Sequence, residues 1–318
     1  MPYAEKKSVL LIAPVMDALY EKLTTAYDVF KLYEESDPES FLNVKGHQFT
    51  AVITRGDTGV KTEILEKLHS LGLIAVFGVG TDAIDLTYTR QHDIAVTITS
   101  GILTSDVADM AMGLMLSGAR KLCQGDRFVR SRDWESEAPP LGSQVSGKRI
   151  GIVGMGNIGR AIARRALAFD MRISYNSRTE KEALPYTWQA DLLSLARDSD
   201  FLVIAASGGA HTKNLINSDV IAAMPAHAWL INIARGSMLD EPALIDALQS
   251  NKIAGAALDV FANEPNISDA WLALDNVVLQ PHVGSATHET RQKMCESVLA
   301  NVDAFFSGKT LPGQLKGL

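Results

Sequence analysis

Short apolar runs alternate with helical patterns through the first hundred residues of the 318-residue chain. The runs at 8–14, 50–54 and 73–80 read SVLLIAP, TAVIT and LIAVFGVG, and the segments 18–27 and 62–72 have the spacing of helices. A strand, a helix and a second strand in this order form the unit of a parallel sheet covered by helices. The alternation therefore confines this part of the chain to an α/β fold.

The alternation breaks near residue 100 and resumes at Lys148. The segment between, 104–135, is long and has apolar or small residues at helical spacing, with Met110, Leu114 and Gly118 on one face. Such a face suits packing in a core and packing against a second subunit equally well.

We therefore predict an α/β protein of two doubly wound parallel-sheet domains. Residues 1–99 with 289–318 would form a discontinuous lid domain, and residues 100–288 an inserted dinucleotide-binding domain. The cleft between them would hold the reaction.

Charge and cysteine content limit the partners. The net charge of -7 leaves no basic excess to neutralise phosphates, which argues against nucleic acid and membrane surfaces. No apolar stretch reaches the eighteen or so residues of a membrane span. Two cysteines suit a reducing compartment, so we expect a cytoplasmic protein, and we predict no metal site.

A glycine motif opens the second alternation. The stretch RIGIVGMGNIGRAIA carries Gly154, Gly156 and Gly159 directly after an apolar strand and at the start of a helix. In this context the motif indicates a dinucleotide site, with the first glycine in a tight turn, the second approached by pyrophosphate, and the third packed against the strand. Amides near Asn157 and Ile158 would then face the anion, with Met155 within the same turn. The alternative is a tight turn without a ligand.

The end of the next strand indicates which dinucleotide is bound. NAD sites place a carboxylate there, about 20 residues after the glycines, to accept from the ribose 2′-hydroxyl. This chain has Asn176, Ser177 and Arg178 instead. A guanidinium and a hydroxyl suit a 2′-phosphate, so we predict NADP(H) as the preferred cofactor. The alternative is NAD(H), with Arg178 as a surface residue.

Three ionisable residues follow three strands of the second alternation. Arg235 follows AWLINIA, Glu264 follows GAALDVFAN, and His282 follows NVVLQP. Parallel strands bring these positions to one edge of the sheet. Reduction of a 2-keto acid needs a cation to hold the carboxylate, an acid to protonate the developing alkoxide, and a carboxylate to support that acid. Arg235, His282 and Glu264 suit these roles in that order. Taken singly, each could instead be an ordinary strand-end, loop or packing residue.

Several blocks together resemble one family, the D-isomer-specific 2-hydroxyacid dehydrogenases, and within it the glyoxylate/hydroxypyruvate reductase branch. The blocks cover nearly the whole chain: FGVGTDAIDL, TSDVADMAMGLML, GIVGMGNIGRAIA, LINIARGSMLDEPAL, AGAALDVFANEP and LDNVVLQPHVGSAT. The resemblance implies a flavodoxin-like lid, a Rossmann domain and a homodimer built on 104–135. It also implies that the lid amides of Val79 and Gly80 bind the substrate carboxylate.

The resemblance implies further cofactor contacts. Asp259 and the backbone of Ile233 would meet the nicotinamide carboxamide and its ribose, and Ser207 and Thr212 would lie near the phosphates. The chain departs from the family here, because SGGAHT replaces the usual proline-containing turn. Trp271 stands where the family often has a small residue, and could either shape the cleft or pack as a surface aromatic.

The predicted function is therefore NADPH-dependent reduction of a small 2-keto acid to the D-2-hydroxy acid. Arg55 in TRGDTG could reach the substrate from the lid or be solvated. Two alternatives remain open. One is a dinucleotide-sensing binding protein of the corepressor kind, and the other is a reductase for bulkier 2-keto acids such as hydroxyphenylpyruvate.

Overall fold

The computed structural model describes residues 6–315 and divides them into two compact units. Unit 1 contains the described residues up to Leu103 and those from Thr287 onward, and unit 2 is Thr104–Ala286. The boundaries lie four residues after and two residues before those expected from the sequence. The first lies later because unit 2 begins with the helix Thr104–Ala119, and the second lies earlier because the final helix and its N-cap, Thr287, both belong to unit 1.

Unit 1 is built on a five-stranded parallel sheet with the order β2-β1-β3-β4-β5. Strand β4 and most of β3 are apolar and fully buried, as strands covered by helices on both faces must be. This strand order is the flavodoxin-like one, which confirms the predicted class. The strands are β1 (Ser8–Leu11), β2 (Asp28–Lys31), β3 (Ala51–Arg55), β4 (Leu73–Phe77) and β5 (Ala95–Thr97).

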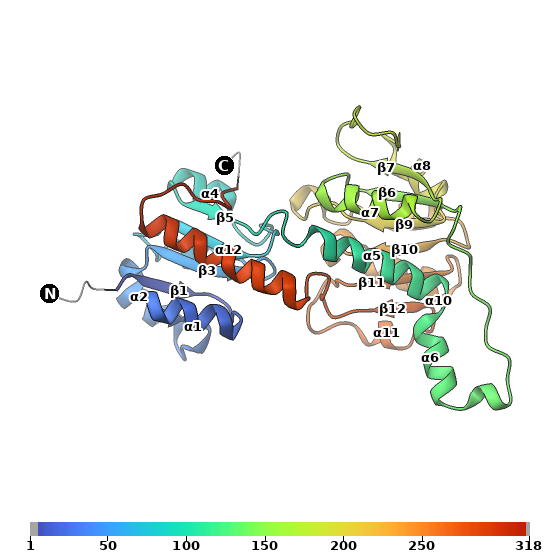
Figure 1. Ribbon diagram of the computed structural model, residues 1–318, viewed down its shortest axis with the longest axis horizontal. Coiled ribbons are helices and arrows are strands. Elements are labelled where there is room, and N and C mark those ends of the chain that lie inside the picture. The colour runs from blue at the N-terminus through green and yellow to red at the C-terminus, as the bar shows by residue number, and fades with distance from the viewer. Residues whose placement is uncertain (1–5, 316–318) are drawn as a thin grey trace. The chain divides into compact units, whose positions relative to one another are not determined.

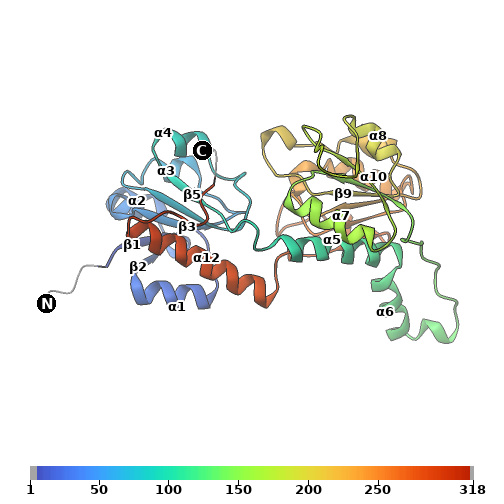
Figure 2. The same ribbon diagram turned by 45° about the horizontal axis from the view of Figure 1, so that its top comes forward.

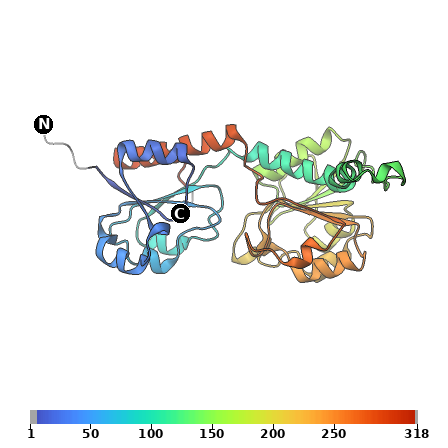
Figure 3. The same cartoon turned by 90° about the horizontal axis from the view of Figure 1, so that it is seen from below.

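Helices cover both faces of this sheet. Helices α1 (Asp17–Ala26) and α12 (His288–Phe306) lie on one face, and α2 (Pro38–Lys45), α3 (Thr62–Leu65) and α4 (Leu86–Gln91) lie on the other (Figure 3). Helix α12 packs against α1 and β4, so a helix from the C-terminal part of the chain covers the sheet formed by its first hundred residues.

Unit 2 is built on a seven-stranded parallel sheet with the order β12-β11-β10-β9-β6-β7-β8. The order reverses between β6 and β9, which is the switch point where doubly wound sheets bind ligands. The short β8 was not predicted, because two residues carry no periodic signal. The strands are β6 (Arg149–Val153), β7 (Arg172–Asn176), β8 (Thr187–Trp188), β9 (Phe201–Ile204), β10 (Trp229–Asn232), β11 (Gly255–Leu258) and β12 (Val277–Leu279).

Helix α5 (Thr104–Ala119) packs along α7 (Asn157–Leu167) over this sheet (Figures 1 and 2). A Cβ at Gly118 would lie 2.5 Å from the Trp229 ring, so the helix approaches β10 as closely as it does only because residue 118 is glycine. Leu114 is buried with Gly118, which assigns this part of the predicted apolar face to the core of unit 2. Met110 is only half-buried.

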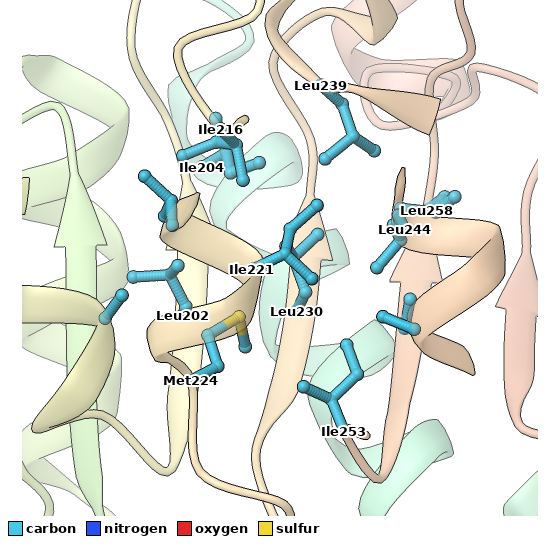
Figure 4. Close-up of a cluster of buried hydrophobic side chains, with 14 of the residues drawn as sticks. Leu202, Ile204, Ile216, Ile221, Met224, Leu230, Leu239, Leu244, Ile253 and Leu258 are labelled. Carbon is cyan, nitrogen blue, oxygen red and sulfur yellow. The ribbon is translucent and has the colours of Figure 1, made fainter. Parts of the chain in front are cut away.

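The other face of the sheet also carries a hydrophobic core. Side chains of β9, β10 and β11 pack against α9 (Ser218–Ala223) and α10 (Glu241–Gln249), as Figure 4 shows for Leu202, Leu230, Leu258, Ile221 and Leu244. Trp271, in the short α11 (Asp269–Leu272), is fully buried in this cluster. It is therefore a core residue, and not the surface aromatic that the sequence allowed.

A buried carboxylate joins three chain segments at the amino edge of this sheet. Asp200 accepts hydrogen bonds from the Arg149 backbone amide (2.8 Å) and from its guanidinium (2.9 and 3.2 Å), and pairs with His227 Nε2 (2.8 Å). Burial raises the pKa of the Asp200 carboxyl, but these hydrogen bonds outweigh burial and hold that pKa well below its usual range.

We expect Asp200→Asn to lower the free energy of unfolding of unit 2 by about 2–3 kcal/mol at pH 7, since it removes the anion between Arg149 and His227. A lowered folded-state pKa adds stability above the unfolded pKa of about 4, and that stability is lost as pH falls through the folded value. The deficit should therefore narrow below about pH 4. The measurement is urea unfolding followed by tryptophan fluorescence, because all four tryptophans lie in unit 2.

The matched control is Asp198→Asn, which makes the same charge change on an exposed side chain two residues away. It should stay within about 0.5 kcal/mol of the wild type. A deficit for Asp200→Asn that is constant from pH 7 to pH 3 would contradict the assigned role of the carboxylate.

Candidate active site

The chemistry-bearing loops of unit 2 all follow the carboxyl ends of its strands. The strands are parallel, so the loops after β6, β7, β9, β10, β11 and β12 leave the sheet at one edge. The glycine turn follows β6, next to the switch point. Direct contacts join it to its neighbours: the Gly154 amide donates to the Asn176 carbonyl at the end of β7 (2.9 Å), and a Cβ at Gly154 would lie 2.5 Å from Ala206 after β9.

The absence of a side chain has a different consequence at each of the three glycines. Gly154 has φ +99°, in the region that favours glycine. A Cβ at Gly159 would lie 2.1 Å from the Gly154 carbonyl oxygen, so α7 can pack this closely only without a side chain there. At Gly156, by contrast, no heavy atom of the described residues beyond its chain neighbours and the adjoining helix backbone lies within 4 Å of the Cβ position. The space beside Gly156 is therefore open to a ligand.

A dinucleotide pyrophosphate fits this turn. Gly156 is the N-cap of α7, and it has no side chain to bond the first helical amides. Those amides, which begin at Asn157 and Ile158, carry the positive end of the helix dipole toward the open space beside Gly156. Met155, within the turn, has a buried side chain.

The segment after β7 is compact and ends in an exposed guanidinium. Asn176 Nδ2 donates to the Gln189 and Ala190 carbonyls (2.8 and 3.1 Å), which joins the end of β7 to the residues just after β8. Ser177 Oγ donates to the Thr179 carbonyl (2.7 Å). Arg178 is exposed and forms no hydrogen bond or ion pair with any residue that the structure describes.

The loop after β9 is held by its own hydroxyl. Thr212 Oγ1 donates to the Ser207 and Gly209 carbonyls (3.1 and 3.0 Å), while Ser207 is exposed. Ile233, just after β10, is buried, and its amide donates to the Ile204 carbonyl (3.4 Å). Both segments therefore lie at the edge that carries the glycine turn, beside β9.

The histidine and the carboxylate predicted for catalysis are brought together. His282 Nδ1 lies 2.6 Å from Glu264 Oε2, and Glu264 Oε1 accepts from the Phe261 amide (2.8 Å). The His282 side chain is 35% exposed, so its second nitrogen is not sealed in the core. With Nδ1 directed at Glu264, Nε2 is the nitrogen that can exchange a proton with a substrate.

Asp259 fixes the loop that carries His282. Its two carboxylate oxygens accept from the amides of Val283 and Gly284, both at 2.8 Å, and His282 itself has φ +54°. A Cβ at Gly284 would lie 2.8 Å from Asp259 Oδ2. Burial raises the pKa of the Asp259 carboxyl. These contacts give Asp259 a structural role that the sequence did not suggest.

The turn that carries Arg235 depends on a buried amide that sequence analysis missed. Asn232, the last residue of β10, accepts from the Ala234 amide (3.0 Å) and donates to the Arg235 carbonyl (2.9 Å). Arg235 Nη1 donates to the Ala234 carbonyl (2.8 Å). The available signal was a polar residue at the end of the apolar run AWLIN.

The lid residues predicted for substrate lie at the carboxyl edge of the unit 1 sheet. Val79 and Gly80 follow β4, and a Cβ at Gly56, after β3, would lie 3.1 Å from the Gly80 carbonyl oxygen. The two turns therefore pack backbone against backbone. Arg55 is exposed to solvent and forms an ion pair with Asp57.

The described residues contain neither a metal-ligand cluster nor a membrane-spanning helix. No group of three or more His, Cys, Asp or Glu side chains in residues 6–315 is arranged to hold a metal ion. Over the same residues, every helix is too short or too polar to cross a bilayer.

Comparison with known proteins identifies the family. Residues 112–284 match the model of the D-isomer specific 2-hydroxyacid dehydrogenase, NAD binding domain. The chain is 43% identical to a 2-ketogluconate reductase of Gluconobacter oxydans, over 97% of this chain and 98% of that protein. The chain belongs to the D-isomer specific 2-hydroxyacid dehydrogenases. This confirms the resemblance inferred from the sequence, and it makes the protein an oxidoreductase that uses NAD(P).

Other relatives extend the likeness to both units. A hydroxyphenylpyruvate reductase of Plectranthus scutellarioides is 40% identical over 96% of this chain and 98% of its own length. An NADPH-dependent glyoxylate/hydroxypyruvate reductase from Sinorhizobium meliloti, solved with NADP and malonate, has a TM-score of 0.91 and 34% identity, covering 98% of this chain and 97% of that one.

We expect Gly156→Ala to weaken NADPH and NADH binding by about tenfold or more, because the methyl group enters the space left for pyrophosphate. It should change the free energy of unfolding by less than about 0.5 kcal/mol, since no described atom is near it. Fluorescence titration and urea unfolding measure the two effects.

The partner variant is Gly159→Ala, which should destabilise unit 2 by about 2 kcal/mol through the clash with the Gly154 carbonyl. Wild-type cofactor affinity in Gly156→Ala would show that the open space beside this glycine is not the pyrophosphate site.

Proposed function

We propose that this dehydrogenase uses NADPH to reduce a small 2-keto acid of the glyoxylate/hydroxypyruvate type to the D-2-hydroxy acid. The observation that carries the proposal is the 2.6 Å pairing of His282 Nδ1 with Glu264 Oε2 at the sheet edge that holds the glycine turn. The relatives named above are reductases of 2-keto acids, which supports the same reaction class.

In this proposal each catalytic side chain has one task. Bound NADPH supplies the hydride that adds to the carbonyl carbon of the keto acid. Arg235 binds the substrate carboxylate and polarises the carbonyl. His282 delivers its Nε2 proton to the carbonyl oxygen as the alkoxide develops. Glu264 holds the imidazole in orientation through its contact with Nδ1.

The remaining binding roles are also proposals. The backbone amides of Val79 and Gly80 would bind the substrate carboxylate, with Arg55 beside them. On the cofactor, Arg178 and Ser177 would hold the 2′-phosphate, and Asn176 would contact the ribose. Ser207 and Thr212 would lie near the phosphates, and Ile233 and Asp259 near the nicotinamide.

A homodimer is supported by an apolar surface on the predicted segment 104–135. None of the residues of α6 (Leu122–Arg130) is buried, and Leu122 and Val129 expose more than half of their surface. Trp134, just beyond the helix, is 66% exposed. Exposed large apolar side chains on one short segment favour contact with a second copy. We further propose a cytoplasmic location, on the two unpaired thiols.

We expect His282→Ala to lower kcat by about 10²–10⁴-fold, because the proton donor is lost, with the Kd for NADPH within about twofold. Steady-state NADPH oxidation and fluorescence titration measure the two quantities. His288→Ala, an exposed histidine six residues later, is the control and should behave as wild type. Unchanged turnover in His282→Ala would refute the proposed role.

A panel of 2-keto acids graded by side-chain size tests the substrate class. Highest kcat/KM for glyoxylate or hydroxypyruvate supports the proposal, whereas highest kcat/KM for hydroxyphenylpyruvate assigns the chain to the bulkier class. Tight NADPH binding without oxidation in the presence of any 2-keto acid would instead indicate a dinucleotide sensor.

We expect Arg178→Ala to raise KM for NADPH by about tenfold and to change KM for NADH by less than about twofold, since only the 2′-phosphate needs the cation. Arg172→Ala removes an exposed arginine from the opposite end of the same strand and should change neither. Equal effects of Arg178→Ala on the two cofactors would exclude a 2′-phosphate contact.

A further inference from the structure

The catalytic carboxylate Glu264 is carried by an exposed loop. Residues 262–266 are all exposed, unlike β11 before them, which is fully buried. An exposed backbone has few packing contacts to fix it, so the 2.6 Å approach of Glu264 to His282 must be set by anchors at the ends of this loop.

One anchor is Glu241, the first residue of α10. Its Oε1 accepts from the Ala262 backbone amide at 2.6 Å, where the loop leaves the core. The preceding amide, on Phe261, donates to Glu264 Oε1 at 2.8 Å. Two consecutive amides are therefore bound by two different carboxylates, so the position of one carboxylate constrains the position of the other.

The same glutamate reaches the far side of the loop. Trp271 Nε1 lies 3.4 Å from Glu241 Oε2, and the Trp271 ring packs edge-on against Phe261. Trp271 is fully buried, so it presents a fixed point to the glutamate. On its inner side the loop contacts the turn of Arg235, because a Cβ at Gly236 would lie 1.9 Å from the Phe261 carbonyl carbon.

We propose that Glu241 is a positioning residue for catalysis, which fixes the loop so that Glu264 supports His282 as the proton donor. This inference rests on the proposed function. The competing explanation is that Glu241 only stabilises α10, as an acidic residue in the first turn of a helix does through the helix dipole.

Two variants separate reach from charge. Glu241→Asp keeps the charge at the helix start but is one methylene too short to hold the Ala262 amide. Glu241→Gln loses the charge and the acceptor that faces Trp271 Nε1 at 3.4 Å, but keeps one oxygen that can accept from the Ala262 amide. Positioning predicts that Glu241→Asp lowers kcat by about tenfold and that Glu241→Gln stays within about threefold. A helix-dipole role predicts the opposite order, with Glu241→Gln impaired more than Glu241→Asp.

The split between kcat and KM gives a readout that a stability defect would not move. A misplaced Glu264–His282 pair slows proton transfer but leaves substrate binding by Arg235 in place, so Glu241→Asp should lower kcat and keep KM for the 2-keto acid within about twofold. Asp219→Ala removes an exposed first-turn acid from α9 and should leave both kcat and KM unchanged.

The outcomes distinguish this proposal from the proposed function. If His282→Ala loses turnover but Glu241→Asp keeps the wild-type kcat, the positioning role is wrong and the reaction stands. If His282→Ala keeps turnover, the proposed function fails whatever Glu241 does. A loss of kcat in Glu241→Asp that Glu241→Gln shares in full also overturns positioning.

Discussion

The active edge of unit 2 depends on one buried carboxylate, that of Asp259. Its two oxygens bind the amides of Val283 and Gly284 and so hold His282 in a left-handed conformation. That conformation costs about 1–2 kcal/mol for a residue with a Cβ. Two hydrogen bonds to a charged acceptor, at about 1.5–3 kcal/mol each, exceed this cost. The direction of the imidazole is therefore set from β11, the strand beside its own.

The rest of the site is built by close approach of backbones. Gly236 has no room for a Cβ against Phe261, which brings the Arg235 turn against the loop of Glu264. Gly255 and Gly118 make the same allowance for the Trp229 ring deeper in the sheet. Small residues in the strands and turns thus set the spacing at which long side chains meet. For this reason β11, with the sequence GAAL, has small residues where its neighbouring strands have bulky ones.

The amino-acid sequence predicted what local patterns encode. Apolar runs gave the parallel strands, the glycine spacing gave the turn before α7, and the positions of His282 and Glu264 after strands gave their meeting at one edge. What escaped prediction depends on partners distant in the chain. The Ala262 amide bound by Glu241 lies 21 residues away, and β8 exists only by pairing with β7. The burial of Trp271 follows from a cluster assembled from several elements, which no single window of sequence contains.

Both edges of the unit 2 sheet carry a carboxylate paired with an imidazole, but the two pairs have different roles. At the amino edge, Asp200 is bound by a backbone amide, a guanidinium and an imidazole, so hydrogen-bond donors surround its charge and it serves stability. At the carboxyl edge, Glu264 from an exposed loop meets the partly exposed His282 from the loop after β12, and the contact leaves Nε2 of the imidazole outside the pairing. A carboxylate whose oxygens are occupied by protein donors does not bind a substrate. An imidazole that contacts a carboxylate through one nitrogen can still exchange a proton through the other. The sheet therefore carries a fully paired carboxylate at its amino edge, and the groups proposed for catalysis at its carboxyl edge.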